Sequence, residues 1–228
     1  FDRTITKIDI GDELFREFGR IEPYLTMLKN DEIDIKDYWI TMFENLEKGI
    51  TVEQLKEFAA NVEVDPYFKP FAEWLREEEI PLAVISDGFD IYINTVLELR
   101  GLDWLPVYSN KMIFTAGGEP QPHFPGATES CECKCASCKR NAILTNTPDD
   151  QIIVFIGDGY SDFCAAEHAD VIFAKKDLQK YCYQNNLPHY DFQNFFDVKR
   201  LLEKSIKEKT IKKRHQAYLK RKKAFETE

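Results

Sequence analysis

From residue 80 onward the chain alternates short apolar segments with helical patterns, and this alternation constrains the fold more than any other feature. In chain order, the segments are residues 81–85 (strand), 91–99 (helix), 106–108 (strand), 140–144 (helix), 152–156 (strand), 162–167 (helix) and 170–173 (strand). Short strands separated by helices are typical of a parallel sheet with helices on both faces. The sequence therefore predicts an α/β fold with a doubly wound parallel sheet.

The segment before this alternating region is helical. Apolar residues recur at intervals of three and four between Gly11 and Leu75, which predicts about four helices. Thr51, followed by Glu53 and Gln54, has the pattern of a helix N-cap with an acidic first turn. We expect these helices to form a cap inserted after the first strand of the sheet.

The expected organisation has three parts. Residues 1–11 and 76–198 would form the Rossmann-like core domain, residues 12–75 the helical cap, and residues 199–228 a basic C-terminal helix. The Gly- and Pro-rich stretch at 116–126 is expected to be a loop or an irregular hairpin.

The C-terminal segment is basic, although the chain as a whole is acidic. Residues 199–223 contain 12 Lys or Arg and 2 Glu, whereas the formal net charge of the chain is −10. Apolar residues recur in this segment at helical intervals. We therefore expect a solvated helix that docks on the chain's own acidic surface, with a nucleic-acid-binding segment as the alternative. Nucleic acid is not the expected partner.

The apolar runs and the cysteines bear on the location of the protein. No uninterrupted apolar run approaches the ~18 residues of a membrane span, so no membrane association is expected. Six cysteines are present, and their spacing differs from that of a secreted disulfide framework. We expect free thiols and a cytoplasmic location. The chain opens at Phe1 without a methionine, which leaves an upstream targeting segment open, and the sequence does not indicate an oligomeric state.

Polar residues directly follow two of the predicted strands, where the carboxyl ends of a parallel sheet collect reactive groups. Ser86, Asp87 and Gly88 follow the strand at 81–85, and a hydroxyl with turn amides suits a phosphate. Asp158 and Asp162 bracket a tight turn after the strand at 152–156, and two carboxylates suit a hard cation such as Mg²⁺.

Two further positions belong with these. Asp2 and Thr4 place a carboxylate and a hydroxyl before a turn into a helix, and Lys139 offers a cation at a helix N-terminus, where backbone amides favour an anion. Each residue alone has an ordinary explanation, such as a helix cap for Asp158 or an exposed side chain for Lys139. Their joint occurrence, each at a strand or helix end, indicates a site for a phosphorylated substrate.

With these motifs the sequence resembles the haloacid dehalogenase superfamily, whose first motif is Asp-x-Asp-x-Thr. Phe1-Asp2-Arg3-Thr4 matches that motif from its second position onward. The family's nucleophilic aspartate is therefore expected directly before Phe1. An apolar strand of about five residues is expected before that aspartate, since a doubly wound sheet without its central strand would leave backbone groups unpaired.

The remaining motifs match as well. These are Ser86, Lys139 and the run Gly157-Asp158 to Asp162. The helical segment between the first two motifs resembles the phosphoserine phosphatase branch. Within it, the cysteine-rich stretch before Lys139 and the region 157–174 resemble the 2-hydroxy-3-keto-5-methylthiopentenyl-1-phosphate phosphatases.

The resemblance implies roles for the matching residues near the start of the chain. Asp2 would act as general acid and base and would bind Mg²⁺ through its backbone carbonyl, and Thr4 belongs to the catalytic set. Asp9 stands where phosphoserine phosphatases have a substrate-binding glutamate, and Arg3 stands where many members have glycine.

The later motifs complete the implied site. Ser86, with Asp87 and Gly88, would hold the phosphoryl group together with Lys139. Asp158 and Asp162 would complete the Mg²⁺ site with Asp2. The resemblance thus implies an Mg²⁺-dependent phosphatase that hydrolyses a small phosphorylated metabolite through an aspartyl-phosphate intermediate. A catalytically silent binding or regulatory module of the same fold and a phosphotransferase are the alternatives.

Four of the cysteines are close together in the sequence. Cys131, Cys133, Cys135 and Cys138 provide four soft ligands, enough for a structural Zn²⁺. Free thiols and a labile disulfide are the alternatives, because single-residue spacing would require a tightly coiled loop around one ion. The position of the cluster directly before Lys139 suggests a clamp that fixes the loop leading into that residue.

Overall fold

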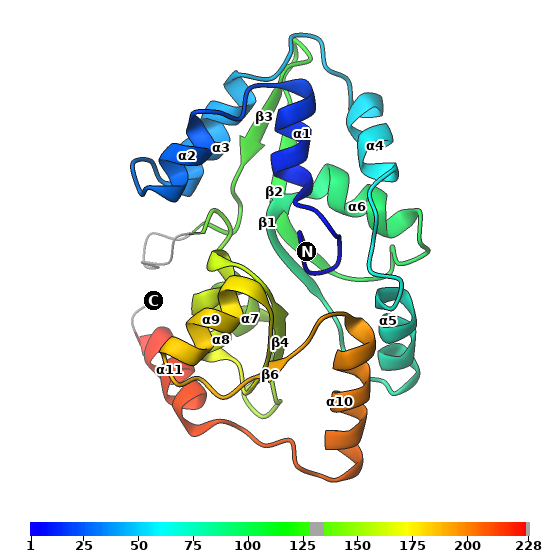
Figure 1. Cartoon of the computed structure of the whole chain (residues 1–228), viewed down its shortest axis with the longest axis vertical. Coiled ribbons are helices and arrows are strands. Elements are labelled where there is room, and N and C mark those ends of the chain that lie inside the picture. The colour runs from blue at the N-terminus through cyan, green and yellow to red at the C-terminus, as the bar shows by residue number, and fades with distance from the viewer. Residues whose placement is uncertain (128–134, 227–228) are drawn as a thin grey trace. The chain divides into compact units, whose positions relative to one another are not determined.

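A computed structural model describes residues 1–127 and 135–226 of the chain (Figure 1). These residues form two compact units: the first comprises 1–64, 82–127 and 135–137, and the second comprises 65–81 and 138–226. None of the helices in the described part of the chain combines the length and the apolar character needed to cross a membrane. The predicted boundaries of core, cap and tail stay predictions.

The first unit combines helices with a small sheet. Its helices are α1 (Ile10–Phe18), α2 (Tyr24–Lys29), α3 (Ile35–Glu44), α4 (Val52–Ala60) and α6 (Asp90–Glu98), and its strands are β1 (Val84–Phe89), β2 (Val107–Phe114) and β3 (Pro120–His123). β1 pairs with β2 in parallel, whereas β2 and β3 form an antiparallel hairpin. The Gly- and Pro-rich stretch thus contains the turn and the second strand of a hairpin, one of its two expected forms.

Side-chain caps fix where the helices of the first unit begin. The carboxylate of Asp9 accepts a hydrogen bond from the backbone N–H of Asp12 at the start of α1, and Asp34 caps α3 in the same way. Thr51 and Gln54 form a reciprocal capping box at α4, which confirms the N-cap predicted there. Local side-chain hydrogen bonds of a kind that can be predicted from the sequence therefore stabilise the starts of these helices.

The core of the first unit is an aromatic cluster around the end of β1. Phe89 lies 5.2 Å from Trp39 and 4.8 Å from Phe43 of α3, measured between ring centroids, and Phe15 of α1 contacts both rings of α3. Edge-to-face aromatic pairs of this kind stabilise the packing beyond the area that they bury. The cluster holds the segment that contains Ser86 against two helices.

The second unit contains a parallel sheet. Its strands are β4 (Val154–Gly157), β5 (Val171–Ala174) and β6 (Tyr190–Asp191), and its helices are α5 (Phe68–Glu77), α7 (Lys139–Asn146), the 3₁₀ helix η1 (Tyr160–Asp162), α8 (Phe163–His168), α9 (Lys176–Gln184), α10 (Phe195–Lys207) and α11 (His215–Glu226). β5 pairs in parallel with β4 and with β6. Parallel strands alternating with helices confirm the predicted α/β class.

Two helices that are far apart in the sequence pack together in the second unit. The ring of Phe195 in α10 lies 4.8 Å from Phe68 and 5.3 Å from Phe71 of α5. The carboxylate of Asp65 accepts a 3.1 Å hydrogen bond from the backbone N–H of Phe195, in addition to the cap that Asn194 provides. The start of α10 is thereby tied to the segment before α5.

The basic tail contains the end of α10 and the separate helix α11, with residues 208–214 between them. The guanidinium of Arg214 donates hydrogen bonds to the carbonyl oxygens of Ala166, Glu167 and Ala169 at the end of α8. In α11, Lys220 pairs with Glu167 and Arg221 pairs with a buried aspartate, Asp170, at 3.1 Å. These contacts confirm that the tail docks on acidic groups of the chain itself.

Candidate active site

The first eight residues form a tight turn that fixes Asp2. The backbone N–H of Ile5 donates to the carbonyl of Phe1 at 2.7 Å, and Arg3 and Ile8 are joined by a 3.1 Å backbone bond. Asp2 Oδ1 accepts a 2.9 Å hydrogen bond from the backbone N–H of Ile10, the first residue of α1. A carboxylate at a helix N-terminus is favoured by the helix dipole. Thr4 is buried in this turn.

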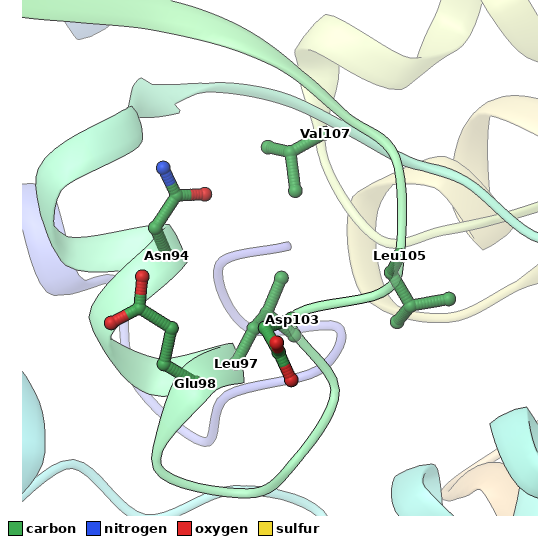
Figure 2. A pocket seen from close by; sticks show the side chains of 6 residues that line it. All are labelled: Asn94, Leu97, Glu98, Asp103, Leu105 and Val107. Atoms are coloured by element: carbon green, nitrogen blue, oxygen red, sulfur yellow. The ribbon is translucent and has the colours of Figure 1, made fainter.

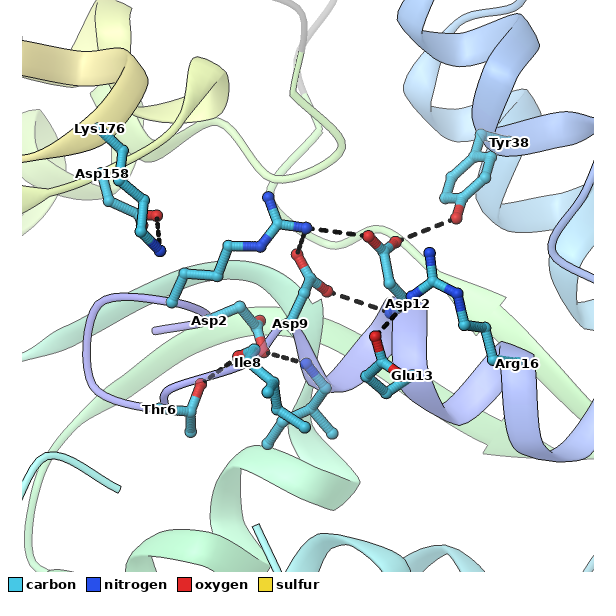
Figure 3. A network of polar contacts seen from close by, with 12 residues as sticks. Asp2, Thr6, Ile8, Asp9, Asp12, Glu13, Arg16, Tyr38, Asp158 and Lys176 are labelled. Carbon is cyan, nitrogen blue, oxygen red and sulfur yellow. Dashed lines mark hydrogen bonds and ion pairs between the residues drawn. The ribbon is translucent and has the colours of Figure 1, made fainter. Parts of the chain in front are cut away.

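Arg3 occupies the left-handed region with φ 56°, a conformation that glycine adopts without a steric cost. Its guanidinium pairs with Asp9 at 3.3 Å and with Asp12 at 3.0 Å. The hydroxyl of Tyr38 donates to Asp12 Oδ1 at 3.2 Å (Figure 3). Asp9, a predicted substrate contact, is thus a helix cap and an ion-pair partner. The sequence reasoning did not single out Asp12 or Tyr38, because neither belongs to a motif.

The network around Asp12 changes its acidity. Burial, followed by the nearby charge of Asp9, raises the pKa of Asp12 to about 6, although Arg3 and the Tyr38 hydroxyl act in the opposite direction. Burial also raises the pKa of Tyr38, as does the charge of Asp12. Tyr38 is therefore a neutral donor at neutral pH, and Asp12 is an acid poised close to it.

The pairing of β1 with β2 becomes irregular between Ile85 and Phe89, where the predicted phosphate-binding residues lie. The backbone N–H of Gly88 donates to the hydroxyl oxygen of Ser86 at 3.0 Å, so the buried hydroxyl is oriented by its own turn. The carboxylate of Asp87 accepts a 2.8 Å hydrogen bond from the backbone N–H of Ser137. The second predicted motif is thus joined to the residues that precede Lys139.

Gly88 brings three groups of the first unit together. A Cβ atom at Gly88 would lie 2.0 Å from the hydroxyl oxygen of Tyr92 and 2.9 Å from Asp2 Oδ2. No side chain fits there, so the glycine is required for the close approach of these groups. Asp2 and the Ser86 segment, predicted as parts of one site, are neighbours. Tyr92 is a neighbour that the motifs did not reveal.

In the second unit, Lys139 and Asp162 form a buried ion pair. The Lys139 ammonium lies 2.7 Å from Asp162 Oδ1 and donates to the hydroxyl of Ser161 at 2.8 Å. Asp162 Oδ2 accepts hydrogen bonds from the backbone N–H groups of Asp158 at 2.9 Å and Gly159 at 3.0 Å. Both oxygens of Asp162 are therefore engaged, and Lys139 is buried rather than an exposed side chain.

The acidity of Asp162 follows from these contacts. Burial alone would raise its pKa, but the Lys139 ammonium and the N–H of Gly159 outweigh that effect and lower the pKa below its ordinary value. Asp162 is accordingly an anion at neutral pH that holds the lysine of one predicted motif and the turn of the next.

Asp158 differs from Asp162 in its surroundings. It is buried, and its Oδ2 lies 3.5 Å from the ammonium of Lys176, a half-exposed side chain at the start of α9 (Figure 3). A buried carboxylate that attracts a cation has the donor chemistry that Mg²⁺ prefers. Within residues 1–127 and 135–226, however, no three His, Cys, Asp or Glu side chains are grouped to hold a metal.

The cysteine cluster is described only in part. Cys131 and Cys133 lie outside the described residues, whereas Cys135 is half-buried and Cys138 is buried at the N-cap of α7. Among the cysteines elsewhere, Cys182 is a buried free thiol whose pKa burial raises to about 11, and Cys164 is disulfide-bonded. The expectation that Cys164 is a free thiol was therefore wrong, and the structural Zn²⁺ has no support in the described part.

A small pocket of about 200 Å³ lies beside α6 in the first unit (Figure 2). Its lining residues are Asn94, Leu97, Glu98, Asp103, Leu105 and Val107. None of the predicted site residues belongs to this lining. The pocket is therefore separate from the groups that gather around Gly88.

Comparisons with known proteins agree with the motifs. The family model for haloacid dehalogenase-like hydrolases matches residues 1–167. A 2-hydroxy-3-keto-5-methylthiopentenyl-1-phosphate phosphatase of Bacillus pumilus is 32% identical over 91% of this chain and 91% of its own length. A polyol phosphate phosphatase of Saccharomyces cerevisiae is 26% identical over 87% of this chain and 88% of its own.

The fold is also similar to solved structures. A substrate-bound phosphoserine phosphatase complex superposes with a TM-score of 0.66 at 20% identity, covering 88% of this chain and 94% of the other. Likeness at this level of identity concerns the fold alone. It confirms the predicted Rossmann-like α/β class.

Proposed function

This chain belongs to the haloacid dehalogenase-like hydrolase family, and from that premise we propose that it is an Mg²⁺-dependent phosphatase acting on a small phosphorylated metabolite. The predicted enzyme class, a phosphoric monoester hydrolase, is confirmed by the family and by the phosphatases among its relatives. The observation that carries the proposal is the buried pair of Lys139 and Asp162, which joins a cation to the turn that bears Asp158.

The proposed chemistry begins with an aspartate directly before Phe1 as the nucleophile. It would attack phosphorus, expel the alcohol and form an aspartyl phosphate that water then hydrolyses. Asp2 would protonate the leaving oxygen and later accept a proton from the attacking water. The anchoring of Asp2 Oδ1 by the N–H of Ile10 supports this role, because an acid–base group must be held in one orientation.

Ser86 and Lys139 would hold the phosphoryl oxygens. Ser86 is buried and oriented by the N–H of Gly88, so its hydroxyl is positioned before a substrate arrives. The Lys139 charge would counter the negative charge that develops on those oxygens. Its pairing with Asp162 supports this role, since a buried ammonium that is held by a carboxylate needs no reorganisation.

Asp158 would be the direct side-chain ligand of Mg²⁺, and the backbone carbonyl of Asp2 a second ligand. When bound, the metal would supply positive charge for the phosphoryl group. Asp162, whose two oxygens already accept three donors, is better suited to holding the turn and orienting ligands than to direct coordination. The pairing of Lys176 with Asp158 would give way when the metal binds, because Lys176 is half-exposed and solvent screens its charge.

For the substrate we propose the class of small phosphomonoesters, with an enol phosphate of the kind named for the Bacillus pumilus relative as the first candidate. The polyol phosphate named for the yeast relative is the second candidate. A phosphorylated amine such as phosphoserine is the weakest, because Asp9, which would receive the ammonium, is paired with Arg3.

The test is phosphate release from a panel of phosphorylated metabolites with and without Mg²⁺, using the full-length protein. We expect Asp158→Asn to lower kcat/KM at least about a hundredfold, since it removes the direct metal ligand. Asp149→Asn, on an exposed loop, is the matched control and should keep full activity.

Activity without Mg²⁺ or full activity of Asp158→Asn would contradict the metal assignment. Absence of turnover on the whole panel would favour a silent binding module of the same fold. Phosphate transfer that requires an added alcohol acceptor would instead indicate a phosphotransferase.

A further inference from the structure

The carbonyl oxygen of Asp87 is held by a side chain from the neighbouring strand. Asn110 of β2 is 0% exposed, and its Nδ2 donates a 2.6 Å hydrogen bond to that carbonyl. A carbonyl oxygen can only accept, so the nitrogen of the amide and not its oxygen must face it. Asn110 belongs to none of the motifs that indicate the site, yet it contacts the turn that contains Ser86.

This contact lies where the pairing of the two strands is interrupted. β1 and β2 pair up to Ile85 and again at Phe89, which stands opposite Asn110. Between these points, three residues of β1 (86–88) stand opposite one residue of β2. Backbone groups in such a bulge cannot all pair with the neighbouring strand, and a buried group left unpaired is destabilising. The Asn110 amide supplies a donor to the carbonyl of Asp87 at this point.

The peptide unit that accepts from Asn110 also orients the hydroxyl of Ser86. The carbonyl of Asp87 and the N–H of Gly88 belong to one planar group, because the peptide bond between them does not rotate freely. Asn110 holds the carbonyl end at 2.6 Å, and the N–H end donates to Ser86 Oγ at 3.0 Å. With a lone pair so occupied, the hydroxyl keeps its own hydrogen for a phosphoryl oxygen. Loss of the amide would remove a restraint on the peptide and thereby on the hydroxyl.

The amide of Asn110 is also costly. Its other polar atom, Oδ1, is buried and has no hydrogen-bond partner in the part of the chain that the structure describes. An unsatisfied buried acceptor is destabilising, and a strand-favouring apolar residue such as valine would avoid it. Packing alone therefore does not explain an asparagine at this position, whereas the need for its Nδ2 donor does.

We propose that Asn110 is a positioning residue for the phosphoryl group: its amide fixes the peptide between Asp87 and Gly88, and this peptide directs the Ser86 hydroxyl toward a phosphoryl oxygen. The inference rests on the proposed phosphatase function, in which Ser86 holds that oxygen. It adds to the site a residue of β2 that acts through its neighbour and does not itself touch the substrate.

The experiment measures turnover of the phosphomonoester that the full-length wild type hydrolyses fastest with Mg²⁺. Asn110→Ala should lower kcat about tenfold and change KM less than about threefold, because Ser86 would bind the phosphoryl oxygens most strongly in the transition state. Ser109→Ala is the matched control, since the buried Ser109 hydroxyl donates to the carbonyl of Asn110 within the same strand. Its kcat should stay within about twofold of the wild type.

A double-variant comparison separates positioning from a loss of structure. In a Ser86→Ala background the hydroxyl to be positioned is gone, so adding Asn110→Ala should lower kcat by less than about a further twofold. Asn110→Val is a second variant without a donor. It fills space that alanine leaves empty, and it should show the same loss of kcat as Asn110→Ala. Each protein is assayed under conditions in which its urea unfolding curve shows it to be folded.

Three results would overturn the positioning role alone, with the wild type still active. These are an unchanged kcat in both variants at position 110, an equal loss of kcat with and without the Ser86 hydroxyl, and failure of both variants to fold, which would make Asn110 a residue of the fold. A wild type inactive on every phosphomonoester would instead overturn the proposed function and this role with it.

Discussion

Gly157, the last residue of β4, leaves room for the side chain of Asp162 in the acidic turn that follows. A Cβ atom there would lie 2.5 Å from Asp162 Oδ2 and 2.8 Å from Asp162 Cγ. Asp162 cannot move aside without losing its bonds to Lys139 and to two backbone N–H groups. We expect Gly157→Ala to lower the free energy of unfolding by about 2 kcal/mol or more and to lower kcat/KM, as measured by urea unfolding and phosphate release.

Gly159 provides the matched control, because it lies two residues away and a Cβ atom added there would meet no other atom within 4 Å. Gly159→Ala should therefore fold and turn over substrate nearly as the wild type does. Equal behaviour of the two alanine variants would show that crowding of Asp162 does not determine the sensitivity of this turn.

The raised pKa of Asp12 predicts that the free energy of unfolding depends on pH. Its folded-state pKa is about 6 against an ordinary value of 3.8, so the native state binds this proton more tightly than the unfolded state does. The resulting stabilisation is complete below the ordinary pKa and is lost as pH rises through about 6. Asp12→Asn cannot ionise, and it should gain roughly 2 kcal/mol relative to wild type between pH ~4 and pH ~7.

The measurement is urea unfolding of both proteins across that pH range. Arg3 attracts Asp12 only when the carboxyl group is ionised, and the pKa of about 6 already contains that attraction. Any offset between the two curves therefore reflects the uncharged contacts that the substitution changes. The diagnostic quantity is the change with pH in the difference between the two free energies of unfolding, and not the size of that difference at one pH. Parallel curves of the free energy of unfolding against pH would contradict the raised pKa.

Among the elements, α11 depends on a buried ion pair for its docking on α8. The side chains of Arg221 and Asp170 are 9% and 0% exposed, and Arg221 also donates to the carbonyl of His168. Removing one partner leaves the other charge buried without compensation, which costs about 3 kcal/mol or more. We expect Arg221→Met to lower the urea midpoint and to release the C-terminal helix to limited proteolysis.

The control for this variant lies on α10. Lys207 pairs with Glu203 at 2.9 Å on a solvent-exposed face, and exposed pairs of this kind contribute little. Lys207→Met removes the same charge and should leave the urea midpoint unchanged. An Arg221→Met protein as stable and as resistant to protease as this control would contradict the docking by Asp170.

Elements whose signals are local could be predicted from the sequence. The capping box of Thr51 and Gln54 was predictable because both partners lie within one turn, and the strands after residue 80 were predictable from their apolar runs. The division of the basic tail into two helices was not predicted. Its break depends on Arg214, which binds carbonyl groups of α8 that are about fifty residues away in the sequence.

For the molecule as a whole, the motifs predict which residues belong to the site, whereas the neighbours of those residues are seen only in the structure. Asp2 and the Ser86 segment could be predicted as neighbours from their motif positions. The place of Tyr92 could not, because it arises from the close approach of two glycine backbones rather than from any spacing along the chain. The same holds for Asp9, whose pairing with Arg3 depends on the left-handed backbone of that arginine.

The bond between Lys139 and Asp162 also has a consequence for inheritance. The two codons lie far apart, yet each side chain is the buried counter-charge of the other. Replacing either residue alone leaves the charge of the other buried without a counter-charge, which lowers the free energy of unfolding. We therefore expect these two positions to covary among relatives, so that a replacement of one residue is found only together with a replacement of the other.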